Sequence, residues 1–335
     1  SASEFLDCRG AHGMTIYSGL LGTGGYLPET ILTNEEISRT VETTNEWIVE
    51  RTGIRERRIA ARHETASSMA EAAARQAIEA AGIEPDQIDL IIVGTGTPDR
   101  VFPSTACLLQ HRLGLRRGAA FDVQAACSGF IYALSVADQF IRAGNARHVL
   151  VVGSELNSRL VDWSDRTTCV LFGDGAGAVV MGATDTPGLL STHIHSDGQY
   201  QDLLYVPNPN ACFSEDETAS RYLKMQGNEV FKVAVNTLGK IVDETLADNG
   251  LMKADIDWLV PHQANIRIIT ATAKKLKMPM ERVVVTVERQ GNTSSASIPL
   301  ALNEAIRDGR IQRGQTVLME AFGGGFAWGS ALLRY

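Results

Sequence analysis

The 335-residue chain lacks several features that would place it in a common functional class. No stretch approaches the roughly 20 apolar residues that cross a bilayer, and there is no secretory signal pattern. Basic residues are outnumbered, and the net charge of −8 argues against non-specific nucleic-acid binding. Neither a membrane nor a nucleic acid is therefore predicted as a partner.

Cysteine is scarce, and its spacing excludes two further classes. Outside the N-terminal segment that holds Cys8, the chain has Cys107, Cys127, Cys169 and Cys212, with no CxxC pair. This spacing is too wide for a zinc ribbon, and paired His or Cys at ligand spacing are not evident, so no metal is predicted. So large a chain does not need a disulfide framework, and the reducing cytoplasm is the expected location.

One segment is set aside before the fold is considered, and two glycine-rich motifs are excluded as nucleotide sites. Residues 1–13 lack periodicity, and a strand-like run follows Met14 at once, so the segment is interpreted as a leader outside the fold. Gly22-Thr-Gly-Gly and Gly173-Asp-Gly-Ala-Gly do not complete a dinucleotide or phosphate loop, and no nucleotide cofactor is predicted.

The rest of the chain alternates short apolar runs with amphipathic stretches, a pattern typical of an α/β architecture. Helices are predicted over 67–81, 130–141 and 229–246, and a surface loop over 206–220. Strands are predicted at 90–95, 149–153, 177–181, 258–261, 283–287 and 316–320.

The order of these elements repeats loosely. Runs beginning at Pro85, Phe121, Arg147 and Gly173 are followed, in the same order, by similar runs in the second part of the chain. This predicts an ancient duplication, with halves 14–185 and 186–335. The overlay places Cys127 within about one residue of Asn292.

Cys127 is the strongest candidate for chemistry. A short alternating run from Phe121 ends in small residues, then the cysteine opens a largely apolar helix. Unpaired N–H groups and the helix dipole favour a thiolate there, and a thiolate can accept an acyl group. A buried structural cysteine is the alternative, and this segment alone does not separate the two.

Three other positions combine polar chemistry with special backbone requirements. His262 follows a strand end and can face a shared cavity, although a loop histidine is the plainer interpretation. Asn292 follows Gly291 and precedes a serine-rich helix start, where it could also be a simple cap. The glycines around Gly324 form a turn that can present N–H groups to an oxyanion, or a plain hairpin.

Six stretches together resemble the β-ketoacyl-acyl-carrier-protein synthase III family, the initiating condensing enzymes of type II fatty-acid synthesis within the thiolase superfamily. The resemblance covers essentially all of residues 14–335, and the stretches that carry it are Thr44–Arg57, Ala125–Phe130, Phe172–Ala178, Val260–Asn265, Gln290–Ser294 and Ala321–Ser330. The resemblance implies the thiolase fold, a five-layered α/β/α/β/α duplication, and a homodimer. It also implies an acyltransferase that needs no cofactor beyond the coenzyme A thioester it consumes.

The implied reaction is a decarboxylative Claisen condensation of an acyl-CoA with malonyl-acyl carrier protein. Cys127 would carry the acyl group, His262 and Asn292 would donate to the enolate oxyanion, and the N–H groups of Cys127 and Gly324 would form the oxyanion hole. Elongating condensing enzymes and thiolases generally have a second histidine at this position, so Asn292 points to the initiating synthases or to the chalcone-synthase-like branch. The short chain and the Trp47 and Arg166 motifs favour the initiating synthases.

Substrate contacts are also implied by the resemblance. Trp47, Arg51 and Arg166 match coenzyme A contacts, with the adenine between Trp47 and Arg166. Phe102 matches a residue that crosses the dimer interface and limits the acyl pocket, which favours acetyl. Carrier-protein contacts are implied for one basic segment: Gln263, Ala264, Asn265, Ile266, Arg267 and Lys274.

Three alternatives stay open at this level. A homologue could use another primer or build a secondary metabolite. A silent acyl-carrier or CoA-binding protein would not transfer acyl groups to Cys127. A cysteine hydrolase could also use Cys, His and Asn, but it would leave the CoA-type residues without a role.

Overall fold

Two β-sheets form the framework of the protein. The structure is a computed structural model, and it describes residues 15–208 and 221–335. The leader expected at 1–13, most of the predicted 206–220 loop, and Cys212 lie outside the described residues. In the first sheet of the described chain, five strands run in the order β1-β7-β6-β4-β5. Their bounds are Tyr17–Tyr26, Asp174–Thr184, His148–Leu156, Leu90–Gly94 and Ala119–Val123.

The second sheet repeats this arrangement with one strand fewer among the described residues, in the order β11-β12-β13-β8. The bounds are Trp258–Pro261, Thr316–Gly323, Ala327–Arg334 and Leu189–Ser196. In the first sheet β4 and β6 are parallel, while β6 with β7 and β7 with β1 are antiparallel. The second sheet follows the same pattern: β11 and β12 are parallel, while β12 with β13 and β13 with β8 are antiparallel. The strands of the two sheets come from residues 17–184 and 189–334, and the division of the chain near residue 185 stays a prediction.

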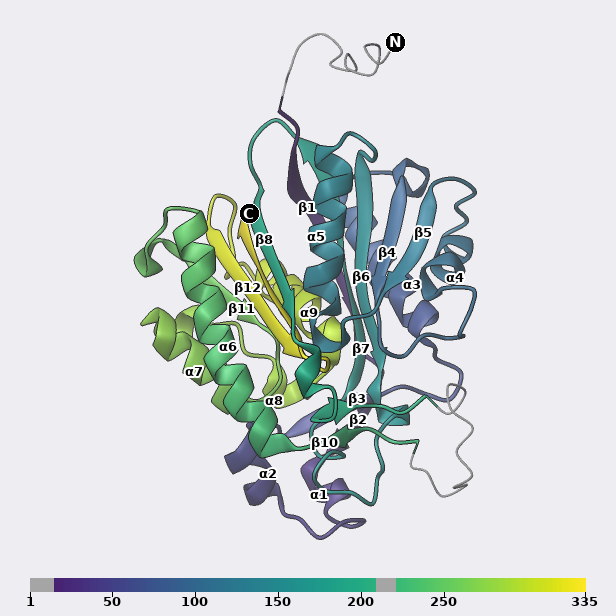
Figure 1. Ribbon diagram of the computed structural model, residues 1–335. Helices are drawn as coiled ribbons and strands as arrows, with labels where there is room; N and C mark the ends of the chain where they lie inside the picture. Colours follow the sequence, from purple (N-terminus) through teal and green to yellow (C-terminus); the bar gives the residue numbers. More distant parts are fainter. Residues whose placement is uncertain (1–14, 209–220) are drawn as a thin grey trace, which may run out of the picture.

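Helices cover both sheets and fill the space between them (Figure 1). The outer face of the first sheet carries α3 (Ala66–Ala81) and α4 (Thr105–Arg112). The layer between the sheets holds α5 (Gly129–Arg142) and α9 (Ser297–Arg307), and α6 (Gly227–Asp248) and α7 (Ile266–Leu276) cover the second sheet. This is the predicted five-layered α/β/α/β/α fold.

Short elements complete the chain. They are β2 (Thr30–Thr33), α1 (Asn34–Ile37), α2 (Asn45–Thr52), β3 (Glu56–Ile59), β9 (Leu204–Tyr205), β10 (Lys224–Met225) and α8 (Val287–Gln290). β2 pairs with β3, and β9 pairs with β10. Helix α2 begins at the Thr44 cap and ends at Gly53, whose φ of 78° suits glycine.

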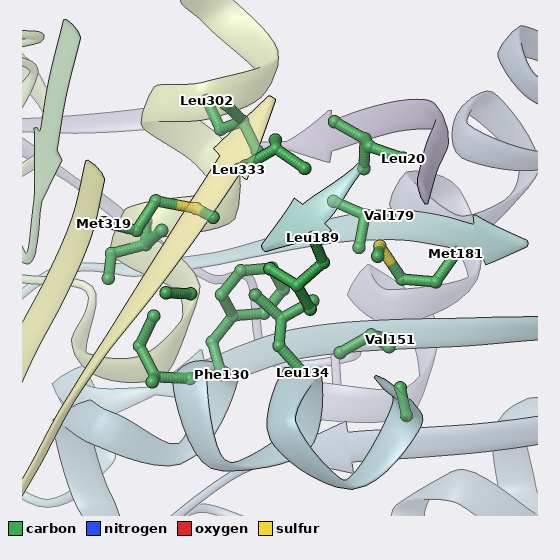
Figure 2. Packing of buried hydrophobic residues seen from close by; sticks show 14 of the residues in the cluster. Leu20, Phe130, Leu134, Val151, Val179, Met181, Leu189, Leu302, Met319 and Leu333 are labelled. Carbon is green, nitrogen blue, oxygen red and sulfur yellow. The ribbon is translucent and has the colours of Figure 1, made fainter. Parts of the chain in front are cut away.

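The central helix layer is apolar on more than one side because sheets lie on both sides of it. Figure 2 shows Phe130 and Leu134 of α5 packed with Val179 of β7, Met319 of β12 and Leu333 of β13. Phe130 is fully enclosed, so Phe130→Ala would cost about 3–5 kcal/mol of folding free energy. The core therefore fixes α5, and with it the turn that precedes it.

Two details of the predicted repeat are wrong. Residues 283–287 do not form a strand: Val283 makes one isolated bridge to Leu259, and Val287 begins α8. The tight turns Ala126–Ser128 and Ser294–Ala296 precede α5 and α9 in the same way. When these two turns are aligned, Cys127 corresponds to Ser295. Asn292 lies three residues before Ser295, so it is not within one residue of the position equivalent to Cys127.

Candidate active site

One cavity of about 1340 Å³ collects the predicted reactive residues from both halves of the chain. Cys127 enters from the turn before α5, His262 from the end of β11, and Asn292 from the segment before α9. All three side chains are buried yet line this cavity. The fold therefore brings together residues that are up to 165 positions apart in the sequence.

A sharp turn presents Cys127 at the start of α5. Ala126 adopts a left-handed φ of 46°, and Cys127 follows before the helix begins at Gly129. Gly323 passes so close that a Cβ there would lie 2.6 Å from the Cys127 backbone nitrogen and 3.0 Å from its Cβ. Any side chain at residue 323 would displace the turn, so glycine is required there.

The thiolate expected from the sequence is not the resting form. Burial raises the pKa of the Cys127 thiol to about 12, and a hydrogen bond with Ser294 lowers it only in part. The buried Glu155 carboxyl also disfavours the anion. The site therefore holds a neutral thiol, because desolvation outweighs the favourable position at the helix start.

His262 is equally desolvated. Burial lowers its pKa to about 3, so the imidazole is neutral over the physiological range. Its backbone N–H donates to the Glu320 carbonyl at 2.8 Å, which fixes it at the end of β11. Its Nδ1 lies 2.6 Å from the hydroxyl of Ser297, leaving Nε2 as the second ring nitrogen.

Asn292 is held by backbone contacts with residues 171 and 173. Its N–H donates to the Leu171 carbonyl at 2.8 Å, and its carbonyl accepts from the Gly173 N–H at 3.0 Å. The side-chain Oδ1 accepts from the Ser294 N–H at 2.8 Å. This orients the amide, and Nδ2 has no acceptor among the described residues.

The glycine before Asn292 is required by the backbone. Gly291 has φ 65° and ψ −163°, a conformation essentially confined to glycine. A Cβ there would also lie 3.0 Å from the Leu171 carbonyl oxygen. The Gly-rich stretch that begins at Phe172, which the sequence did not explain, thus forms the strand end against which Asn292 rests.

The sequence left open that Asn292 is a simple helix cap, and the structure gives no side-chain cap at either helical element that follows it, the Ser294–Ala296 turn and α9. Ser297 contacts His262, while Ser295 donates to the Gly94 carbonyl and to Glu155. The only sequence signal that Ser295 and Ser297 make these contacts was a run of small hydroxyl residues beside an Asn.

Gly323 ends β12, and Gly324 and Gly325 lie in the turn that leads to β13. Gly324 lines the cavity, and its N–H has no acceptor within the described parts of the chain. The turn lies beside Cys127 through Gly323. The geometry offers a backbone donor next to the thiol, as an oxyanion hole requires.

The predicted coenzyme A residues lie together at one side of the cavity. The guanidinium of Arg51 is 4.8 Å from the Trp47 ring centroid, and that of Arg166 is 5.3 Å from it. Trp47 and Arg51 line the cavity, and Arg166 is tethered to the Glu42 carbonyl at 2.7 Å. An adenine between Trp47 and Arg166 needs two stacking gaps of about 3.5 Å each, so Arg166 must move outward.

The predicted carrier-protein segment divides into exposed and buried residues. Arg267 and Lys274 are exposed on α7, and Ala264, Asn265 and Ile266 are partly exposed. Asn265 caps α7, and its side chain accepts from the Ile268 N–H. Arg267 also lies 4.8 Å from the Phe231 ring.

Gln263 does not belong with these contacts. It is fully buried, its amide donates to the Pro261 and Val284 carbonyls, and its Oε1 accepts from the N–H groups of Thr286 and Val287. Its role is structural, because every polar atom of the amide is satisfied inside the protein.

Phe102 occupies an unusual position for a large apolar residue. Phe102 and Val101 are each 83 % exposed in the single chain, and both line the mouth of the cavity. The exposed pair contrasts with the buried cysteine that the same cavity reaches.

Two buried acids were missed by sequence reasoning. Glu155 accepts from Thr97, Ser295 and the Gly96 N–H, which fixes the wall beside Cys127. Glu320 lines the cavity with Oε2 unpaired within the described chain, and burial raises its pKa to about 8. A single acid inside an apolar strand pattern gives no sequence signal of this kind.

No described helix is long and apolar enough to cross a membrane.

Residues 121–198 match the family described as 3-Oxoacyl-[acyl-carrier-protein (ACP)] synthase III, and residues 246–335 match its C-terminal family. A relative in Methylococcus capsulatus, named Beta-ketoacyl-[acyl-carrier-protein] synthase III, is 73% identical over 96% of this chain and 100% of its own.

Solved structures agree with these matches. The 3-oxoacyl-[acyl-carrier-protein] synthase III of Aquifex aeolicus VF5 is 48% identical, with a TM-score of 0.90 over 95% of this chain and 100% of that one. The priming beta-ketosynthase of the R1128 polyketide biosynthetic pathway is 41% identical, with a TM-score of 0.91 over 95% and 96% of the two chains.

Proposed function

The chain belongs to the β-ketoacyl-acyl-carrier-protein synthase III family, and on that premise we propose that it condenses an acyl-CoA, acetyl-CoA first among them, with malonyl-acyl carrier protein. The products are a 3-ketoacyl-carrier protein, CoA and CO2, which starts a fatty acid. The observation that carries the proposal is the convergence of Cys127, His262 and Asn292 on one deep cavity.

The first step transfers the acyl group to Cys127. Its sulfur attacks the thioester carbonyl, the bond between that carbonyl and the CoA sulfur breaks, and the thiol proton of Cys127 ends on the departing CoA sulfur. A resting thiol with a pKa of about 12 is compatible with this exchange, because no free thiolate has to accumulate. The N–H groups of Cys127 and Gly324 stabilise the tetrahedral oxyanion.

The second step needs two neutral donors. Malonyl-carrier protein loses CO2, and the electron pair of that C–C bond forms an enolate whose oxygen accepts from His262 Nε2 and Asn292 Nδ2. The enolate carbon then attacks the acyl-Cys127 carbonyl, the bond from that carbonyl to sulfur breaks, and the departing Cys127 sulfur takes one proton from solution to restore the thiol. A neutral imidazole suits this role because it donates without first binding a proton from solution.

Ser297 sets the protonation of the His262 ring. Its oxygen accepts from the Gln263 N–H at 3.2 Å, and among the described residues the hydroxyl proton has no acceptor except His262 Nδ1. A buried hydroxyl rarely leaves its proton unpaired. Ser297 therefore donates to Nδ1, and the single ring proton of the neutral imidazole lies on Nε2, facing the substrate.

The side chain of Asn292 is also oriented by a hydrogen bond from a neighbouring residue. Because Oδ1 is occupied by the Ser294 N–H, the amide presents its NH2 group to the cavity. A donor held in this way needs no reorganisation as negative charge develops on the enolate.

Substrate recognition follows from the two exposed sides of the cavity. Trp47 and Arg166 would hold the CoA adenine after Arg166 moves outward, and Arg51 would reach a phosphate. Arg267 and Lys274, with Ala264, Asn265 and Ile266 beside them, form the docking surface for the acidic carrier protein.

The working assembly is a homodimer in which Phe102 closes the acyl pocket of the partner. The 83 % exposure of Phe102 and Val101 in the single chain supports this, because large apolar side chains seldom face water together. A bulky residue at that position favours a short primer such as acetyl.

The reaction as proposed uses no metal or redox cofactor, because the thiol, the neutral donors and loss of CO2 supply the nucleophile, the stabilisation and the driving force. Cys107, Cys127 and Cys169 are free thiols, which fits a reducing cytoplasm.

A second candidate is the same chemistry with another primer, in a secondary-metabolite pathway. The similarity to a priming ketosynthase of polyketide synthesis favours keeping it. The test is a panel of acyl-CoAs with malonyl-carrier protein, followed by release of CO2 and mass of the carrier product. Preference for acetyl-CoA supports the fatty-acid initiator, preference for a longer or branched acyl group supports the second candidate, and no product with any donor rejects both.

A further inference from the structure

We propose that a divalent transition-metal ion binds a surface site made by His193 of β8 and by Glu244 and Asp248 of α6. The site is separate from the proposed condensation, because none of these side chains lines the cavity of Cys127. One imidazole and two carboxylates suit a borderline ion such as Zn2+, with water completing the coordination.

The three side chains already approach the spacing that an ion requires. One ligand atom from each lies within 4.8 Å of the others. Ligands about 2.1 Å from a tetrahedral ion are roughly 3.4 Å apart. Rotation of the Glu244 and Asp248 side chains, which are 37% and 61% exposed, can close the remaining gap.

Regular secondary structure puts these groups on one face. β8 is an edge strand, and His193 and His195 are two residues apart, so both point to the same side of the sheet. Glu244 and Asp248 are four residues apart on α6 and share one helix face. Helix α6 packs on this sheet, and the two faces meet where β8 passes it.

The ring of His193 is oriented before any ion arrives. Its Nε2 lies 2.7 Å from Asp248, and its Nδ1 lies 3.4 Å from the Ser330 hydroxyl, which also contacts Thr245 at 2.6 Å. An imidazole that ligates through one nitrogen and is held through the other is the usual arrangement at metal sites. His193 is also only 11 % exposed, so its position is fixed by packing.

His195 supports the second carboxylate. Its Nε2 lies 2.9 Å from both oxygens of Glu244. This places a histidine behind a ligating carboxylate, in the position of an outer-shell partner. Its ring also lies 5.8 Å from that of Trp328.

The local charge favours a cation. Within the described chain, Glu244 and Asp248 have no lysine or arginine partner, whereas the neighbouring Asp243 is paired with Lys275 at 2.6 Å. The partners of these two carboxylates in the ion pairs of the described residues are the imidazoles of His193 and His195. In the sequence these residues are a His-x-His pair in a strand and two acids in a helix about 50 residues later.

The test uses Zn2+ alone as the probe. Chelator-treated full-length protein carrying Cys127→Ser, so that the active-site thiol cannot contribute, is titrated with zinc by calorimetry. One equivalent should bind with saturation. In the same background, His195→Ala should weaken binding about 10-fold, and His193→Ala or Glu244→Gln should weaken it further.

Asp243→Asn is the matched control, because it removes the same charge one residue away from the site and should leave the affinity unchanged. The melting temperature in zinc-free buffer identifies any variant that does not fold, and zinc should raise that temperature only in proteins with the intact trio. The side-chain NMR signal of His193 Nε2 should also shift with zinc. Equal affinity in His193→Ala and in the parent, or no binding at all, would overturn the proposal.

Discussion

Ser297→Ala should separate the two halves of the reaction. The substitution removes the hydroxyl 2.6 Å from His262 Nδ1 and leaves that nitrogen buried without a partner. An unpaired buried polar group costs about 1–3 kcal/mol. That cost falls on the ring form that carries its proton on Nε2, which is the form that donates to the enolate. Malonyl decarboxylation should therefore slow by about 5- to 150-fold.

The assay is single-turnover release of CO2 from malonyl-carrier protein by enzyme already acetylated on Cys127. Acetylation itself should persist, because Ser297 contacts neither the thiol nor the proposed CoA residues. Ser295→Ala is the control: it removes an equally buried hydroxyl of the same run, but one that binds Glu155 and the Gly94 carbonyl instead of His262. An unchanged rate in Ser297→Ala, or an equal loss in Ser295→Ala, would refute the assigned role of Ser297.

Three further predictions concern other parts of the site. Asn292→Ala should leave acetylation of Cys127 intact and slow CO2 release by about 100-fold; loss of acetylation alone would contradict the donor role. Glu320→Gln should flatten the pH dependence of stability measured by urea unfolding. The raised pKa of Glu320 means that its contribution is full below pH 4.5 and is lost towards pH 8, by at most about 5 kcal/mol; an unchanged pH profile would contradict this. Arg267→Glu with Lys274→Glu should raise KM for malonyl-carrier protein at least 10-fold while acetylation by acetyl-CoA is unchanged; equal losses in both steps would indicate structural damage.

The fold could be predicted because its signals are periodic and repeated. Five of the six predicted strand ranges lie within a few residues of strands in the structure, and the ordered repeat indicated two similar sheets. The run at 283–287 failed because β-branched residues fit a strand by pattern alone, whereas in the structure Val287 begins a helix. A local pattern does not report whether a neighbouring strand is available to pair.

The site was predicted less completely, for electrostatic reasons. Cys127, His262 and Asn292 stand at turns that the sequence marks with small residues and glycine. The prediction that Cys127 rests as a thiolate was wrong, because burial raises the pKa of the thiol more than the helix start lowers it. Burial is a property of the assembled core. Ser297 and Glu320 were missed because one hydroxyl or one carboxyl in a run has many possible roles until its partner is known.

Intact-protein mass spectrometry is the measurement that tests the central claim most directly. The protein is incubated with acetyl-CoA, the adduct is mapped by peptide analysis, and malonyl-carrier protein is then added. The account predicts one acetyl group on Cys127, its discharge by malonyl-carrier protein, and no adduct in Cys127→Ser. An adduct that persists in Cys127→Ser, or no adduct with any acyl-CoA, would contradict Cys127 as the acyl carrier.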